Sequence, residues 1–117
     1  MNRMTFGMYT FPYNPESLKI SHSRRVITRF SPFCGSMTED YGAEAVHVSG
    51  EGEFLGRTAE TELETLIREF KAGGKRNLVV GGELFPAYFE NLTVIRGTES
   101  EAVRFHFEFI EAPALQG

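Results

Sequence analysis

The strongest constraint on the fold is an unbroken alternation of apolar and polar residues near the C-terminus, from Val103 to Phe109. The apolar face of this segment carries Val103, Phe105, Phe107 and Phe109. The polar face carries Arg104, His106 and Glu108. Alternation with a period of two predicts a half-buried β-strand. The phenylalanines therefore predict a thick apolar core on one side of a sheet.

Five other segments have the character of strands. They are residues 5–11, 17–30, 45–55, 77–80 and 87–95. Residues 17–30 read as one long strand or as a strand with a bulge near Arg24. In 87–95 we expect Tyr88, Leu92 and Val94 to share a face. The segment Gly97-Thr98-Glu99-Ser100 predicts a hairpin turn, so that 87–95 pairs antiparallel with 102–110.

Glycine and proline mark the breaks in this pattern. Gly50 and Gly52 lie inside a predicted strand, which indicates a bulge, a sharp bend or a close backbone approach. Residues 31–42 contain Pro32, two glycines and an acidic pair. This composition predicts a loop that could reach another subunit.

A helix is predicted over about residues 58–72. Thr58 is a plausible N-cap, and glutamates fill the first turns, where the helix dipole favours negative charge. The apolar stripe consists of Leu63, Leu66, Ile67 and Phe70. Gly73-Gly74 can supply the left-handed conformation that ends a helix.

The order of these elements predicts an α+β fold. We expect an antiparallel β-sandwich or split β-barrel of about six strands, with one flanking helix. A chain of 117 residues is expected to form a single domain over 1–117, with a folded core at about 4–111.

The composition argues against several classes of partner and of covalent structure. A net charge of -4 gives no general attraction to nucleic acid, so we expect no sequence-specific nucleic-acid partner. The single cysteine excludes an intramolecular disulfide. We see neither a signal peptide nor an apolar run of the roughly 18 residues that a membrane span needs, and we expect no membrane partner.

No catalytic, cofactor-binding or metal-binding residues are predicted, and we expect no enzyme. His22, His47 and His106 lack the local spacing of metal ligands. Cys34 lies in the 31–42 segment with no recognisable base nearby. The glycines at 50–56 do not match a dinucleotide fingerprint, and their two carboxylates would repel a phosphate.

Charge complementarity instead indicates contacts between subunits. Arg24, Arg25 and Arg29 form one basic cluster. Glu51 and Glu53 share the water-facing side of a predicted strand. These five residues are the candidates for a subunit interface, because opposed patches of charge favour association between copies.

The order of several short motifs resembles the small baseplate and tail-tube-related proteins of bacteriophage tails, phage-tail-like bacteriocins and related contractile injection systems. The motifs are 11–18 (FPYNPESL), the pair Arg24-Arg25, 48–56 (VSGEGEFLG), 67–74 (IREFKAGG) and 84–92 (LFPAYFENL). The resemblance covers roughly residues 11–111 and depends on the order of the motifs. The chain is shorter than typical tube proteins.

The resemblance implies a tail-tube-like fold and a structural role. It implies a homo-oligomer, commonly a six-fold ring, in the baseplate or tube-initiation region, between the tail tube and hub or spike proteins. It also implies a place in a virion or phage-like tail particle assembled in the bacterial host cytoplasm.

Two alternatives stay open. The first is a small monomeric ligand-binding β-barrel whose Phe-rich strand lines a pocket. The second is a small hydrolase or isomerase, which would require His47 and Glu51 to meet in a cleft.

Overall fold

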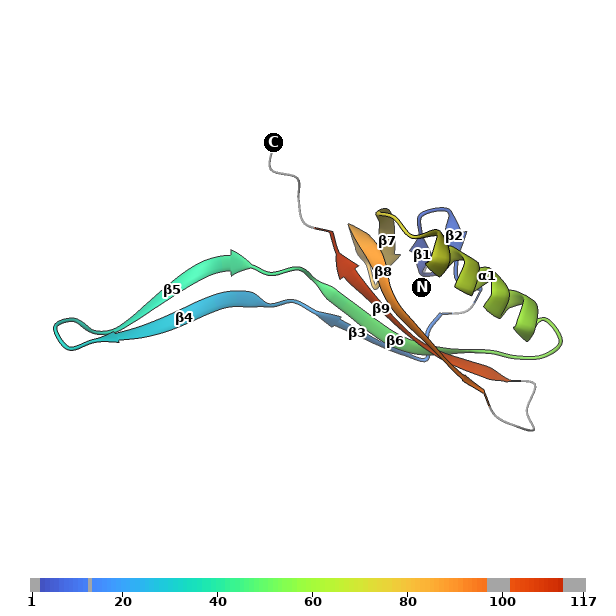
Figure 1. Ribbon diagram of the computed structural model, residues 1–117, viewed down its shortest axis with the longest axis horizontal. Coiled ribbons are helices and arrows are strands. Elements are labelled where there is room, and N and C mark those ends of the chain that lie inside the picture. The colour runs from blue at the N-terminus through green and yellow to red at the C-terminus, as the bar shows by residue number, and fades with distance from the viewer. Residues whose placement is uncertain (1–2, 13, 97–101, 113–117) are drawn as a thin grey trace.

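The computed structural model describes residues 3–12, 14–96 and 102–112 (Figure 1). These residues form nine strands and one helix. The strands are β1 (Thr5–Phe6), β2 (Tyr9–Thr10), β3 (Ser17–Ser21), β4 (Arg24–Ser31), β5 (Gly35–Ala43), β6 (His47–Phe54), β7 (Arg76–Val80), β8 (Glu83–Arg96) and β9 (Val103–Glu111). The helix is α1 (Ala59–Ala72).

Seven strands form one antiparallel sheet in the order β2-β1-β7-β8-β9-β6-β3. Strands β4 and β5 pair only with each other among the described residues. The predicted α+β fold, an antiparallel β structure with one flanking helix, is confirmed. The expected pairing of 87–95 with 102–110 is also confirmed, whereas the predicted turn at 97–100 lies outside the described residues.

The strand count exceeds the six that we expected, for three local reasons. The single strand predicted at 5–11 is wrong, because Gly7, with φ of 62°, opens a turn between β1 and β2. The predicted strand 17–30 divides at 22–23 into β3 and β4. The bulge expected near Arg24 is present, as a register shift between Arg24 and Val26.

The third difference is the segment 31–42, for which the predicted loop is wrong. Residues 35–43 form β5, which pairs antiparallel with β4. Pro32 and Phe33 lie in the short turn that joins the two strands. The glycines and acidic residues of this segment favour a loop locally, but cross-strand pairing with β4 overrides this weak preference.

A second bulge changes the faces of β8. The register with β9 shifts between Phe89 and Asn91, which reverses the alternation along β8. Phe89 therefore shares the inner face with Leu92 and Val94, both partly buried against the core. Tyr88, predicted to share that face, lies on the outer side and is exposed.

The core lies between the inner face of the sheet and α1 (Figure 1). As the alternation predicted, Val103, Phe105, Phe107 and Phe109 of β9 are all buried. The rings of Phe107 and Phe109 have centroids 5.7 Å apart, and Phe109 also packs 4.4 Å from Phe89. Edge-to-face and tilted aromatic pairs add to the stability that burial gives.

The two strand glycines are explained by a close approach rather than by a bulge or a bend. In the unbroken register of β6 with β9, Gly50 lies opposite Phe107 and Gly52 lies opposite Phe105. A Cβ atom at Gly50 would lie 2.7 Å from the Cζ of Phe107. The glycines therefore leave room for the two rings on the inner face.

The helix lies where the sequence predicted it. Thr58 takes the N-cap position, although its side chain makes no capping hydrogen bond, and Gly73 ends the helix with φ of 67°. Leu63 and Leu66 are fully buried against the sheet. The helix thus covers one face of the sheet, with Ile67 and Phe70 at the margin of the core.

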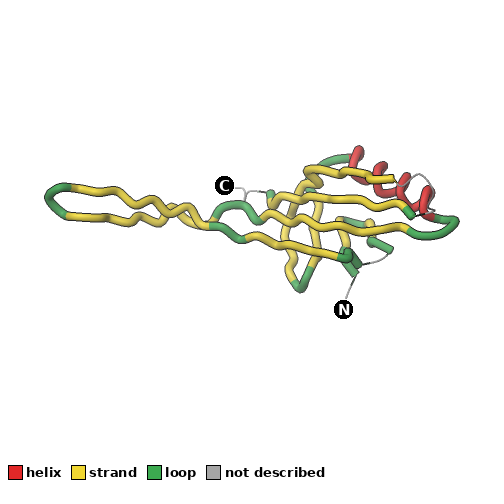
Figure 2. The backbone as a smooth tube through the Cα atoms, turned by 90° about the horizontal axis from the view of Figure 1, so that it is seen from below, coloured by secondary structure: helices red, strands yellow, loops and turns green. Residues whose placement is uncertain are grey.

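The ribbon of β4 and β5 extends away from the rest of the molecule (Figures 1 and 2). We call residues 24–43 the arm and the remaining described residues the body. The radius of gyration is 18.7 Å, whereas a compact chain of this length has about 13 Å. The principal extents of 69 × 35 × 27 Å show that the molecule is elongated.

Candidate assembly surfaces

The arm exposes large apolar side chains on an isolated ribbon. The exposed fractions are 52% for Val26, 78% for Phe30, 95% for Phe33, 50% for Met37 and 51% for Tyr41. A two-stranded ribbon is marginally stable in water without a third strand or a packed face. Exposed apolar surface of this kind marks an interaction site.

The predicted basic cluster lies on β4 of the arm. Arg24 forms an ion pair with Asp40 of β5, with Nη2 2.8 Å from Oδ2. The hydrogen bond from Arg24 holds the pKa of the Asp40 carboxyl below its usual range. Arg29 Nη2 donates to the Tyr41 hydroxyl at 3.4 Å. Arg25 is exposed and forms no ion pair within the described part of the chain.

The predicted acidic pair lies on the body. Glu51 and Glu53 share the outer face of β6, as expected, and Arg104 of β9 contacts both. Arg104 approaches Glu53 at 3.3 Å, Glu51 at 3.8 Å and Glu16 at 3.2 Å. These pairs lie within one subunit. Their further contact with another subunit stays a prediction.

We missed Arg104 as the partner of this acidic pair. Its position becomes clear only from the register that places Arg104 opposite Glu53. The signal was available in principle, because both segments alternate and could have been aligned as neighbouring strands. The turn signal at 97–100 predicts only the pairing of 102–110 with 87–95.

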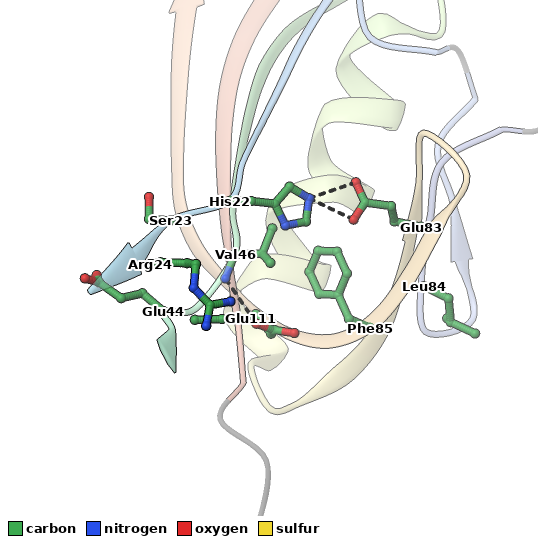
Figure 3. A pocket seen from close by; sticks show the side chains of 10 residues that line it. His22, Ser23, Arg24, Glu44, Val46, Glu83, Leu84, Phe85 and Glu111 are labelled. Atoms are coloured by element: carbon green, nitrogen blue, oxygen red, sulfur yellow. Dashed lines mark hydrogen bonds and ion pairs between the residues drawn. The ribbon is translucent and has the colours of Figure 1, made fainter. Parts of the chain in front are cut away.

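A hollow of about 670 Å³ lies where the arm joins the body (Figure 3). We call residues 22–23 and 44–46, which join the two parts, the elbow. The hollow is lined by His22, Ser23, Arg24, Ala43, Glu44, Val46, Glu83, Leu84, Phe85 and Glu111. Its volume falls within the roughly 300–1,000 Å³ of typical ligand pockets.

Few polar contacts hold the elbow. His22 Nε2 of the elbow lies 3.0 Å from Glu83 Oε1 of the body (Figure 3). The Glu44 amide donates to the Ser23 carbonyl at 2.8 Å. Glu111 is bonded to Val46 twice: the Val46 amide donates to Glu111 Oε1 at 3.1 Å, and the Glu111 amide donates to the Val46 carbonyl at 2.8 Å.

The arrangement does not assemble the catalytic pair of the hydrolase alternative. His47 and Glu51 lie four residues apart on β6, so their backbones are separated by roughly 13 Å. Among the described residues, no group of three or more His, Cys, Asp or Glu side chains could hold a metal ion. Cys34 is exposed in the arm.

The ligand-binding alternative requires the Phe-rich strand to line a pocket, whereas its Phe107 and Phe109 rings are packed in the core. Phe107 and Phe109 have no exposed surface and contact other aromatic rings. The seven-stranded sheet is open in the part of the chain that the structure describes, with β2 and β3 at its two edges. No helix in that part is long and apolar enough to cross a membrane.

Solved structures with a similar architecture come from a virion, a tail and a sheath-tube complex. A chain from the virion of the native gene transfer agent (GTA) particle matches with TM-score 0.61 and 12% identity, covering 96% of this chain and 91% of that one. The chain has a tail-tube-like fold. No protein-family model and no curated protein matches the sequence.

Two further structures share this tail-tube-like fold. A chain from the tail of the empty GTA particle, which has C6 symmetry, matches with TM-score 0.58 and 14% identity, covering 87% of this chain and 80% of that one. A chain from the sheath-tube complex of PVC, an extracellular contractile injection system, in its extended state, matches with TM-score 0.58 and 16% identity. That match covers 95% of this chain and 84% of the other.

Proposed function

We propose that this protein is a structural, non-enzymatic subunit of a phage or phage-like tail, with no cofactor. It forms a ring or adaptor in the baseplate or tube-initiation region, between the tail tube and hub or spike proteins. It therefore belongs to a virion or phage-like tail particle that assembles in the bacterial host cytoplasm. The tail-tube-like fold supports this proposal, because the similar chains come from a virion, a tail and a sheath-tube complex.

The observation that carries the proposal is the apolar arm. Its exposed side chains are covered by no other described part of the chain, and both of its outer strand edges are unpaired. A monomer leaves this surface in water, whereas a neighbouring subunit can cover it and extend the sheet. The arm therefore favours an assembled subunit over a monomeric binding protein.

A ring requires a contact between two different surfaces of the same chain. The basic cluster Arg24, Arg25 and Arg29 lies on the arm, and Glu51 and Glu53 lie on the body. Opposite charges on separate parts suit such a head-to-tail contact. We propose these five residues as interface residues, and a six-fold ring by analogy with the C6 tail.

The test is the absolute mass in solution, measured by light scattering over a concentration series, with electron microscopy of any large species. We expect closed rings or short tubes. A matched variant that replaces Val26, Phe30 and Phe33 by serine removes exposed apolar surface without touching the core, and is expected to stay monomeric. A wild-type protein that remains monomeric at every concentration, and binds an apolar dye in a cavity, would support the ligand-binding alternative instead.

A further inference from the structure

We infer that the elbow hollow is the socket for the arm tip of a second copy of this chain, with Phe33 seated in it. The tip comprises Phe30 to Gly35, and the socket is the hollow defined above. This inference rests on the proposed function, since it names the surfaces through which the copies would meet.

The tip has apolar surface that its own body cannot cover. Phe33 is 95% exposed and Phe30 is 78% exposed. The eight residues of β4 lie between the elbow and the turn that carries Phe33, a span of about 27 Å. The arm is a paired ribbon along this length, so the tip cannot fold back onto the elbow of its own chain. The surface that covers the tip must therefore belong to another molecule.

The socket offers an apolar wall of suitable size. Val46 and Phe85 are nearly buried and form its floor, and Leu84, 67% exposed, lies at its border. Figure 3 shows the Phe85 ring between the His22–Glu83 pair and Glu111. An aromatic side chain that enters such a hollow can bury about 150–250 Å². Aromatic anchors in pockets are the usual hot spots of interfaces.

The charge beside the tip is complementary to the charges of the socket. Glu44, Glu83 and Glu111 line the socket, opposed only by His22 and by Arg24, which is already paired with Asp40. Between residues 26 and 38 the arm has a single charged residue, Arg29. The cation Arg29, next to a tip with exposed phenylalanines, therefore suits an acidic rim around an apolar floor.

The placement also sets a spacing. Tip and socket lie at opposite ends of the same arm, so successive copies joined in this way would be offset by about one arm length, roughly 27 Å. A contact between two different surfaces can repeat from copy to copy, closing into a ring or continuing as a helix.

The only cysteine, Cys34, lies next to Phe33 and supplies a native probe. We would combine it with Ser23→Cys, which changes one exposed oxygen to sulfur at the socket. A disulfide needs Cα atoms about 4.4–6.8 Å apart, so the link from Cys34 to position 23 can form only between two molecules. The matched control is Ser17→Cys, at another exposed serine, which lies at the far end of β3 from the elbow.

The full-length variants are oxidised mildly under conditions in which the wild type assembles, and peptide mapping identifies each link. We expect the Ser23→Cys variant to form covalent oligomers joined between Cys34 and position 23, several-fold above the Ser17→Cys control. In the Ser23→Cys background, Phe33→Ala should reduce this link severalfold, whereas Met8→Ala, which removes an exposed apolar side chain of the body, should not.

The outcomes separate the two proposals. Assemblies that form without a link above the control overturn the socket and leave the tail-subunit proposal standing. A specific link in small oligomers that never grow into particles supports the socket and counts against the ring. Links only between two copies of Cys34 would indicate that arm tips pair with each other, which also overturns the socket. Absence of both assemblies and links overturns both.

Discussion

The ring of Phe105 lies directly over Gly52 on the neighbouring strand, so that a Cβ atom on Gly52 would lie 2.6 Å from the Phe105 Cζ. The ring cannot easily withdraw, because it also packs against Phe54, with centroids 4.8 Å apart. This relationship explains why a strand in the middle of a core has glycine at this position. A larger residue at position 52 would clash with the Phe105 ring.

Gly52→Ala is expected to lower the free energy of unfolding by about 1–3 kcal/mol, through overpacking. Urea unfolding measures the change. The control is Ser49→Ala on the outer face of the same strand, which should stay within about 0.5 kcal/mol of wild type. Adding Phe105→Leu to Gly52→Ala should give a smaller loss than the sum of the two single variants. Strict additivity would show that the ring and the glycine do not interact.

Core and arm phenylalanines should behave in opposite ways. Phe107→Ala removes a ring with no exposed surface, and we expect a loss of about 3–5 kcal/mol in unfolding free energy. Phe30→Ala, on the arm, should change stability by less than about 0.5 kcal/mol but reduce the mass of the assemblies in light scattering. A large stability loss at Phe30 in the monomer would mean that the arm packs against the body in solution.

Arg76 joins β7 to the end of the helix. It forms an ion pair with Glu69, donates to the Gly73 carbonyl at 3.2 Å and lies 5.1 Å from the Phe6 ring centroid. Arg76→Ala is expected to cost about 1–3 kcal/mol, because charged hydrogen bonds and a helix-end contact are lost together. Arg76→Lys should retain only part of this stability, because a single ammonium cannot reproduce the planar, forked hydrogen bonding of the guanidinium group. Full recovery by lysine in thermal unfolding would contradict this account.

Tyr9 gives a prediction at alkaline pH. Burial, with Glu62 and then Glu69 nearby, raises its pKa from 10.0 to about 12. The folded state therefore favours the neutral phenol: the stabilisation is complete below pH 10 and is lost as the pH rises towards 12. We expect wild type to lose more stability across this window than Tyr9→Phe, as measured by urea unfolding at several pH values. Equal losses of unfolding free energy in the two proteins would contradict the raised pKa of Tyr9.

Local pattern predicted much of the body. The alternation at Val103–Phe109, the heptad-like stripe of Leu63 and Leu66, and the glycine-bounded helix end each reflect a period or a backbone conformation that a few neighbouring residues determine. Those elements lie where expected. The prediction that Tyr88 shares a face with Leu92 and Val94 is wrong, because one bulged residue between them reverses the alternation along β8.

The arm could not be predicted as a ribbon from local signals. Pro32 and the glycines at 35 and 42 indicate turns, yet β5 exists because Glu39 and its neighbours pair with β4. The two strands pair without packing on a core, so the sequence has no buried apolar face from which this pairing could be predicted. The hollow at the elbow depends on bringing together residues 22, 44, 83 and 111, whose proximity follows only from the sheet topology.

The elbow has a mechanical consequence. Two short backbone segments and a few exposed polar contacts connect arm and body, while the aromatic rings of the core lie entirely in the body. A change in the direction of the arm would therefore leave the core packing intact. Subunits joined through such arms would behave as stiff blocks on compliant links, so an assembly could curve or absorb strain at its joints while each block kept its shape.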